Sequence, residues 1–261
     1  MTRDVSEPLI NLRLDGQCAL ITGASSGLGR HFAHLLARAG ARVALAARRL
    51  DALDAVAADI SAAGGEAIAV EMDVTDADSV RRGVLWAEKA FGPPRVLINN
   101  AGVALTKPAL EVDEHDWDRV VDTNLKGAWL MARGAADRMR EHGGGVIVNI
   151  ASILGLRVAA GVAPYAIAKA GVIHMTRVLA LELARHGIRV NALAPGYIET
   201  DLNRDFFASP AGQALVKRIP QRRLGALDDL DGPLLLLATS ASRYMTGTVV
   251  VADGGHLVSS L

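Results

Sequence analysis

The sequence predicts an α/β protein with one doubly wound parallel sheet of about seven strands and helices on both faces. Three observations predict this fold class. Short apolar segments recur along the chain, and nearly all are followed by a stretch long enough for a helix. Many of these segments are continuously apolar, as in parallel strands covered on both faces. No linker divides the 261 residues, and their 51% hydrophobic content is sufficient for one large core.

The apolar segments give the order of the expected elements. The seven expected strands are Cys18–Thr22, Arg42–Ala47, Ala67–Met72, Arg95–Asn99, Gly145–Ala151, Ile188–Ala194 and Thr248–Asp253. Two long helices are expected at about 113–140 and 163–186, and Pro233 is expected in the first turn of a later helix, where proline is tolerated. Residues 1–13 are predicted to be a flexible N-terminal segment, and 14–261 a single domain.

Composition excludes several classes of function. The 28 basic and 28 acidic residues balance, so no field is expected to attract nucleic acid or a membrane surface. The lone Cys18 is expected to be a buried apolar side chain. The N-terminus lacks an apolar signal segment and no run approaches the ~18 residues of a membrane span, which favours the cytoplasm. The seven histidines have no completing ligands, so no metal site is predicted.

A glycine-rich loop follows the first strand. "TGASSGLG" places Gly23, Gly27 and Gly29 between that strand and a helix. Glycines permit a tight turn and close backbone approach, and a helix N-terminus presents free N–H groups to a pyrophosphate. Ser25 and Ser26 could add hydroxyl donors. The alternative is a simple turn, which the strand before and the helix after disfavour.

The residues after the second strand bear on which dinucleotide binds. A site for NAD usually has a carboxylate there, but here Arg48 and Arg49 follow Ala47. Guanidinium groups bind phosphate through charge-assisted hydrogen bonds. We therefore expect NADP(H) to be preferred, with NAD(H) still possible. In the alternative interpretation both arginines are solvated and Asp51 caps the next helix.

Tyr165 and Lys169 lie one helical turn apart in "YAIAK". Side chains at i and i+4 share a helix face, so both can point into one cleft. A nearby ammonium favours the phenolate and is expected to lower the pKa of the tyrosine toward neutrality, as a general acid requires. An isolated pair of this kind would more often be a tyrosine at a helix start and a lysine reaching solvent.

The ordered motifs "TGASSGLG", "NNAG" at 99–102, "YAIAK" and "APG" at 194–196 resemble the short-chain dehydrogenase/reductase family, from about Leu14 to the C-terminus. The resemblance implies a Rossmann-like fold and an oxidoreductase. It also implies a homotetramer or homodimer formed through the two long helices. A lid over the substrate is expected at about 197–222, where the segment is too varied for a simple connection.

The resemblance also implies individual roles. The catalytic set would be Asn124, Ser152, Tyr165 and Lys169, with the Ser152 hydroxyl on the substrate oxygen. Asp73 resembles the carboxylate that receives the adenine amino group, although it or Asp76 could instead cap a helix. The remaining cofactor residues are Leu28, Val74, Asn100, Ala101, Gly102, Pro195, Gly196, Ile198 and Thr200, in addition to the glycine loop, the two arginines, Tyr165 and Lys169. The substrate pocket is expected to include Ile153, Leu154, Ala159, Val162, Tyr197, Phe206 and Phe207.

The function expected from these residues is that of a carbonyl reductase or alcohol dehydrogenase. Hydride from NADPH would reach a ketone with a hydrophobic portion while Tyr165 supplies the proton. One alternative is a 3-oxoacyl-carrier-protein reductase, which needs a basic entrance for its acidic carrier, for example Arg138, Arg140 and Arg177. The alternative from another class is a non-catalytic protein that senses a dinucleotide, for which a tuned acid is unnecessary.

Overall fold

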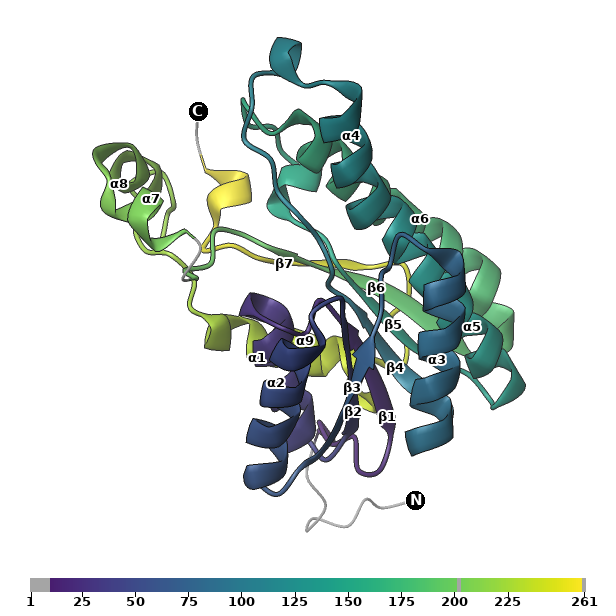
Figure 1. Ribbon diagram of the computed structural model, residues 1–261. Coiled ribbons are helices and arrows are strands. Elements are labelled where there is room, and N and C mark those ends of the chain that lie inside the picture. The colour runs from purple at the N-terminus through teal and green to yellow at the C-terminus, as the bar shows by residue number, and fades with distance from the viewer. Residues whose placement is uncertain (1–9, 201–202, 260–261) are drawn as a thin grey trace.

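A seven-stranded parallel sheet forms the centre of the protein (Figure 1). The structure is a computed structural model that describes residues 10–200 and 203–259. The strands are β1 Cys18–Thr22, β2 Arg42–Ala47, β3 Glu66–Glu71, β4 Pro94–Asn99, β5 Gly145–Ile150, β6 Ile188–Pro195 and β7 Val249–Ala252. They lie in the order β3-β2-β1-β4-β5-β6-β7. The predicted fold class is confirmed, and the strand ends differ from the sequence prediction by no more than one residue.

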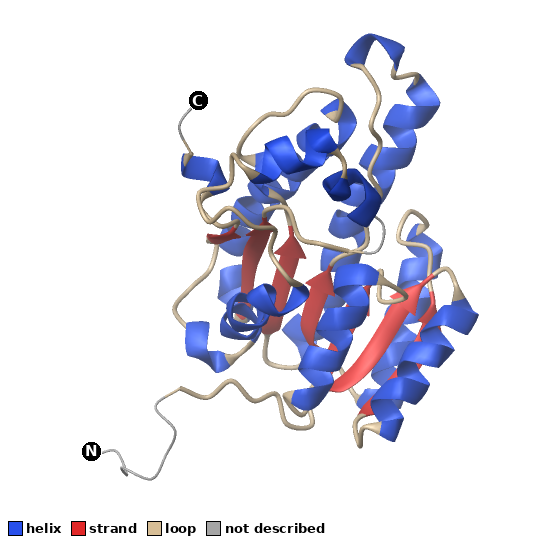
Figure 2. Cartoon of the chain, turned by 90° about the vertical axis from the view of Figure 1, so that its left-hand side faces the viewer, coloured by secondary structure: helices blue, strands red, loops and turns tan. Residues whose placement is uncertain are grey.

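Helices cover both faces of the sheet, as Figure 2 shows. One face packs against α1 (Gly27–Arg38), α2 (Leu50–Ala62) and α9 (Asp231–Ala238). The other packs against α3 (Ala77–Phe91), α5 (Gly127–Glu141) and α6 (Ala163–Leu183). The short α4 (Glu114–Val121) precedes α5. No helix in the described part of the chain has the length and apolarity needed to cross a membrane.

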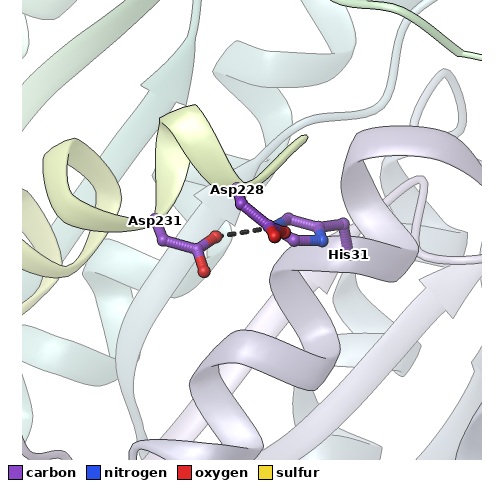
Figure 3. Close-up of side chains that lie close together, drawn as sticks. All are labelled: His31, Asp228 and Asp231. Carbon is purple, nitrogen blue, oxygen red and sulfur yellow. Dashed lines mark hydrogen bonds and ion pairs between the residues drawn. The ribbon is translucent and has the colours of Figure 1, made fainter. Parts of the chain in front are cut away.

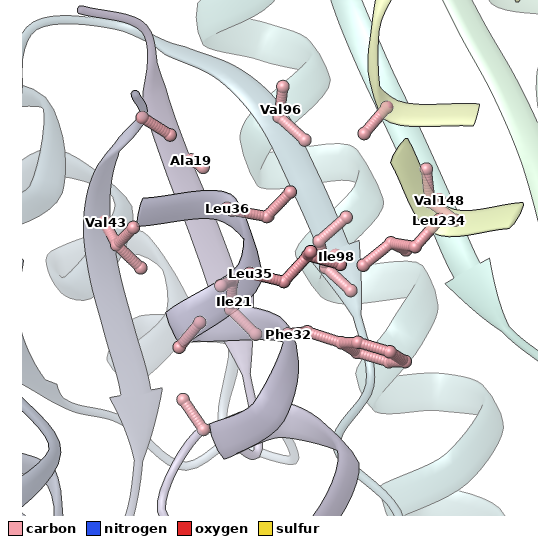
Figure 4. Close-up of a cluster of buried hydrophobic side chains, with 14 of the residues drawn as sticks. Ala19, Ile21, Phe32, Leu35, Leu36, Val43, Val96, Ile98, Val148 and Leu234 are labelled. Carbon is pink, nitrogen blue, oxygen red and sulfur yellow. The ribbon is translucent and has the colours of Figure 1, made fainter. Parts of the chain in front are cut away.

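Burial on both faces explains why the strands are continuously apolar. Ala19 and Ile21 of β1 pack with α1, whereas Leu20 between them packs on the opposite side, and all three are fully buried. Phe32 of α1 extends across the sheet toward Ile98, as Figure 4 shows. Burying a side chain of this size stabilises the fold by about 1.5–3 kcal/mol. The core therefore fixes α1, and with it the loop between β1 and α1.

The N-terminal part of the described chain joins this core at Leu14. Leu14 is buried, and its N–H donates to the Ala39 carbonyl at 2.8 Å. Residues 1–9 of the predicted N-terminal segment lie outside the described residues. Pro233 occupies the first turn of α9, as the sequence predicts, because its missing N–H has no partner in a first helical turn.

The segment after β6 leaves the sheet and forms two short helices, α7 (Arg204–Ala208) and α8 (Pro210–Val216). Ser209 lies between them, and its hydroxyl accepts a hydrogen bond from the Gly212 N–H at 3.2 Å. The predicted lid corresponds to this segment, of which residues 201–202 lie outside the described chain.

Candidate functional site

A cleft of about 920 Å³ lies at the carboxyl ends of the strands. It opens where β1 and β4 are neighbours but their connections run in opposite directions, which is where ligands of open α/β sheets bind. Most of the predicted cofactor residues line it: the glycine loop, both arginines, Asp73, Val74, residues 100–102 and Thr200. Ala46, Met72, Val103 and Thr123 also line it, which the sequence analysis did not predict. Gly29, Tyr165, Lys169, Pro195, Gly196 and Ile198 are not among the lining residues.

The glycine loop has the close backbone approach that its sequence predicts. Gly23 has φ +67° and Gly27 has φ +52°, a region that favours glycine. A Cβ on Gly29 would overlap the Gly23 carbonyl oxygen, whereas a Cβ on Gly27 would stand in open space in the cleft. The Asn100 amide donates to the Thr22 carbonyl at 2.9 Å and holds the end of β4 against the loop.

The two arginines at the end of β2 supply positive charge to the same cleft. Arg49 Nη2 donates to Ser25 Oγ at 3.0 Å and so lies over the glycine loop, and Arg48 is exposed at the rim. Arg49 is the N-cap residue of α2, which has no side-chain cap, so Asp51 does not cap this helix. Open backbone N–H groups, small residues and guanidinium donors fit a dinucleotide with an additional phosphate.

Asp73 and Asp76 have separate roles. Asp76 caps α3, where its carboxylate accepts from the Asp78 and Ser79 N–H groups. Asp73 Oδ1 instead accepts from the Thr75 N–H at 2.9 Å and the Thr75 hydroxyl at 2.8 Å. Burial raises the pKa of Asp73, but the Thr75 hydrogen bonds and the Arg48 charge outweigh it and lower the pKa. Asp73 therefore stands ionised at the wall of the cleft.

Ser152, Tyr165 and Lys169 lie together at the carboxyl end of β5. Ser152 is buried at the start of a short 3₁₀ turn, η3 (Ile153–Gly155), where its Oγ accepts a hydrogen bond from the Leu154 N–H at 3.1 Å. Lys169 is 5% exposed, and its Nζ donates to the Ile150 carbonyl at 2.7 Å. The Lys169 Nζ lies 5.7 Å from the centroid of the Tyr165 ring. The structure thus brings three of the four predicted catalytic residues together.

The pKa of Tyr165 is raised in the structure, whereas the sequence analysis predicts that it is lowered. Burial raises the pKa of Tyr165, and the hydrogen bond with Ser152 lowers it by less. The expected lowering by Lys169 is not found, because the ammonium is directed to the Ile150 carbonyl and not to the phenol oxygen. Burial also lowers the pKa of Lys169 to about 8, from 10.5. The tyrosine is therefore a protonated phenol at neutral pH, the form that a proton donor requires.

Asn124 lies in a π-helical segment, η2 (Asp122–Lys126), that joins α4 to α5. Its amide exchanges two hydrogen bonds with Val103: Oδ1 accepts from the Val103 N–H at 2.8 Å, and Nδ2 donates to the Val103 carbonyl at 2.9 Å. A π-bulge inserts one residue into a helix and is frequent at functional sites. Here it points a buried amide at the segment that follows β4 and lines the cleft.

The residues after β6 form the remaining wall. A Cβ on Gly196 would lie 2.7 Å from the Asp253 Cα, so the turn after Pro195 packs against the end of β7. The Thr200 N–H donates to Asn203 Oδ1 at 2.9 Å, while the Asn203 amide donates to the Ile198 carbonyl at 2.8 Å. These bonds fix the start of the segment predicted to be a lid.

The predicted substrate residues differ in exposure. Ile153 and Phe207 are buried, and Leu154, Val162 and Tyr197 are partly buried. The Tyr197 ring packs against Phe207 with centroids 5.7 Å apart. Ala159 and Phe206 are exposed, with Phe206 at 50%. The lid therefore presents one anchored aromatic side chain and one at the surface.

One histidine cluster escaped the sequence analysis. His31 Nε2 lies 2.6 Å from Asp231 Oδ1 and 3.8 Å from Asp228 Oδ1, as Figure 3 shows. Arg38 Nη2 lies 3.6 Å from Asp231 Oδ2, so this carboxylate already has two basic neighbours. About 200 residues separate His31 from its partners, and sequence spacing could not indicate the pair. We interpret the contact between His31 and Asp231 as one that holds α1 against α9. The absence of a metal site remains a prediction.

Comparisons with known proteins agree with this geometry. The family model described as "short chain dehydrogenase" matches residues 17–211. The gluconate 5-dehydrogenase of Gluconobacter oxydans is 38% identical over 247 residues, covering 94% of this chain and 96% of that protein. A 3-oxoacyl-[acyl-carrier-protein] reductase of Synechocystis is 40% identical, with 94% and 98% covered. A gluconate 5-dehydrogenase of Burkholderia cenocepacia, solved with NADP and tartrate, has a TM-score of 0.93 at 35% identity and covers 97% of this chain and 99% of that one.

Proposed function

This chain belongs to the short-chain dehydrogenase family, and we propose that it interconverts a ketone and a secondary alcohol with NADP(H), with Tyr165 as the acid and base. The family makes it an NAD(P)-dependent oxidoreductase of ketones and alcohols. The observation that carries the finer proposal is the grouping of Ser152, Tyr165 and the buried Lys169 at the carboxyl end of β5.

Each residue of this group has a distinct task in the proposed reaction. NADPH, when bound, supplies the hydride. The Ser152 hydroxyl donates a hydrogen bond to the substrate oxygen as negative charge develops on it. The Tyr165 phenol gives its proton to that oxygen. Lys169 Nζ has three N–H donors, of which the Ile150 carbonyl takes one, and the others would hold the ribose hydroxyls of the bound cofactor.

Three features support NADP(H) as the cofactor. Arg48 and Arg49 lie in the cleft at the end of β2, and no acidic residue ends that strand. The relatives of Beutenbergia cavernae and Burkholderia cenocepacia were solved with NADP. The cleft lining fits a dinucleotide, with the glycine loop under the phosphates and Asp73 at the adenine side.

The test is a set of ketones incubated with NADPH or NADH, with identification of the alcohol formed. We expect NADPH oxidation coupled one-to-one to a secondary alcohol. Tight NADPH binding without turnover of any ketone or acyl-thioester would favour a dinucleotide sensor and contradict the proposal.

A 3-oxoacyl-carrier-protein reductase is the second candidate, favoured by the Synechocystis relative. Two of the three arginines expected at its basic entrance, Arg138 and Arg140, do not lie at the cleft. Arg138 Nε pairs with Glu88 at 2.7 Å and Arg140 with Asp137 at 3.5 Å. Both lie in the last turn of α5, just before β5 begins, and so at the opposite edge of the sheet from the cleft. Activity on a carrier-bound acyl-thioester that far exceeds activity on free ketones would establish this candidate instead.

Assembly into a tetramer or dimer is part of the same proposal. Large apolar side chains are exposed on the two helices predicted to form the interface: Trp117 and Trp129 around α4 and α5, and Ile167, Val178 and Leu181 along α6. Burial of such surfaces between subunits is favourable. Sedimentation analysis of the purified chain tests the proposed assembly. The cytoplasmic location remains a prediction.

A further inference from the structure

A second group of polar side chains lies beside Ser152 and Tyr165 and has no task in the proposed reaction. It comprises Arg157, which follows η3, Tyr197, which follows β6, and His256 in the last 3₁₀ turn, η7 (His256–Val258). The Tyr197 ring is the centre of the group. Its centroid lies 5.5 Å from that of His256 and 5.7 Å from that of Phe207.

His256 carries a buried polar atom without a partner. The side chain is 7% exposed, and its Nδ1 makes no hydrogen bond to any residue that the structure describes. Burial lowers the pKa of His256, and the Arg157 charge lowers it further, so the ring is neutral at neutral pH. A neutral imidazole has one N–H and one acceptor nitrogen. A buried group of this kind is costly unless a ligand completes its hydrogen bonds.

Arg157 adds a guanidinium without an acidic partner in the described part of the chain. Its Nη1 donates to the His256 carbonyl and, at 3.0 Å, to Ser259 Oγ. No carboxylate among residues 10–200 and 203–259 pairs with it, and neither Nε nor Nη2 makes a bond to that part of the chain. Burial raises the pKa of Tyr197, and the Arg157 charge lowers it by less.

The group adjoins the reacting residues. η3 packs so tightly on α6 that a Cβ on Gly155 would lie 2.7 Å from the Lys169 backbone. Arg157 follows two residues later, and its N–H donates to the Ile153 carbonyl at 2.8 Å. Tyr197 is near enough to Tyr165 to raise the pKa of that residue. A substrate whose carbonyl meets Ser152 would therefore extend toward Arg157 and Tyr197.

We propose that Arg157, Tyr197 and His256 form a carboxylate-binding subsite, and that the substrate is a keto acid or the corresponding hydroxy acid. The guanidinium donates the fork of hydrogen bonds that matches a carboxylate. The Tyr197 hydroxyl and the His256 N–H supply further donors, and α7 closes over the group through Phe207. The inference rests on the proposed ketone–alcohol function and names the class of substrate for it.

The test compares free keto acids with their neutral esters. Straight-chain keto acids with the carboxylate one, two or three carbons from the carbonyl are assayed with NADPH, each beside its methyl ester. The wild type is expected to prefer the best acid at least ~10-fold in kcat/KM. Arg157→Met is expected to lower kcat/KM for the acid by ~10–100-fold, mainly through KM, and to leave the ester unchanged. Arg157→Lys retains part of the activity on the acid, because the charge remains but the fork is lost.

Controls separate recognition from folding. Arg218→Met removes another charge that acts on His256, and it is expected to leave the preference intact. His256→Phe keeps the ring packed on Tyr197 and is expected to reduce the preference for the acid. Equal turnover of acid and ester by the wild type, or an equal loss of both in Arg157→Met, would overturn the subsite alone. Failure of the wild type to reduce either compound would overturn the proposed function and the subsite with it.

Discussion

Replacing Lys169 by methionine tests the buried ammonium at the centre of the site. The side chain is 5% exposed, donates a hydrogen bond of 2.7 Å to the Ile150 carbonyl and has no acidic partner among the described residues. Burial lowers its pKa from 10.5 to about 8. That difference corresponds to a folding cost of about 3 kcal/mol at neutral pH. Methionine has a similar length and no charge, but it leaves the carbonyl without its donor, which costs about 1 kcal/mol.

The sign of the pH dependence follows from the two pKa values. The unfolded chain retains the Lys169 proton up to about pH 10.5, but the folded chain only up to about 8. Between these values the unfolded state binds more protons, so this lysine makes the wild type more stable as the pH rises. We therefore expect Lys169→Met to be more stable than the wild type by about 2 kcal/mol at pH 7, and this advantage to disappear by about pH 10.

Urea unfolding of both proteins without cofactor, at pH 7, 8, 9 and 10, measures the difference. Other groups that titrate in this range are common to both proteins and cancel in the comparison. Lys217→Met, which changes an exposed lysine after α8, is the control and should change stability by less than about 0.5 kcal/mol. A variant that is less stable than the wild type at pH 7, or a difference that does not vary with pH, would refute this reasoning.

Three further predictions concern the cofactor cleft and the core. Arg48→Asp should weaken NADP binding ~10–100-fold and leave NAD binding nearly unchanged, as measured by fluorescence titration; equal wild-type affinity for both cofactors would contradict the phosphate assignment. Gly29→Ala should destabilise the protein by about 1–3 kcal/mol, because its Cβ overlaps the Gly23 carbonyl, whereas Gly134→Ala in α5 should be neutral or slightly stabilising; equal losses would show that the loop is not tightly packed. Burial raises the pKa of Cys18 to about 12, so a thiol reagent at pH 8 should label it only after unfolding, and rapid labelling of the folded protein would show that β1 is accessible.

The sheet could be predicted because its signal is local. Each strand is a short apolar run, and burial on both faces makes residues such as Ala19, Leu20 and Ile21 equally apolar. The position of the glycine loop follows from the same signal, since it lies between a strand and a helix. Family resemblance, in turn, placed Ser152 beside Tyr165 although no local pattern joins them.

The parts that could not be predicted depend on long-range contacts or on side-chain direction. The pKa direction of Tyr165 depends on the direction of the Lys169 ammonium, which an i, i+4 spacing leaves open. Arg157 meets the backbone of His256 across 99 residues, and no periodicity links them. Arg138 was wrongly expected at the entrance to the site, and this error was avoidable. The order of elements places the end of α5 directly before β5, at the edge of the sheet away from the site.

The most direct test of the central claim is the rate of ketone reduction by Tyr165→Phe. The exchange removes one hydroxyl and keeps the ring that packs near Lys169. The assay uses saturating NADPH, whose Kd is measured separately. We predict that this Kd is unchanged and that kcat falls by about 10²- to 10⁴-fold, the usual cost of losing a positioned general acid. Tyr244→Phe, at a fully exposed tyrosine, should keep the wild-type rate. A Tyr165→Phe enzyme that reduces the ketone as fast as the wild type would contradict the claim that this phenol supplies the proton.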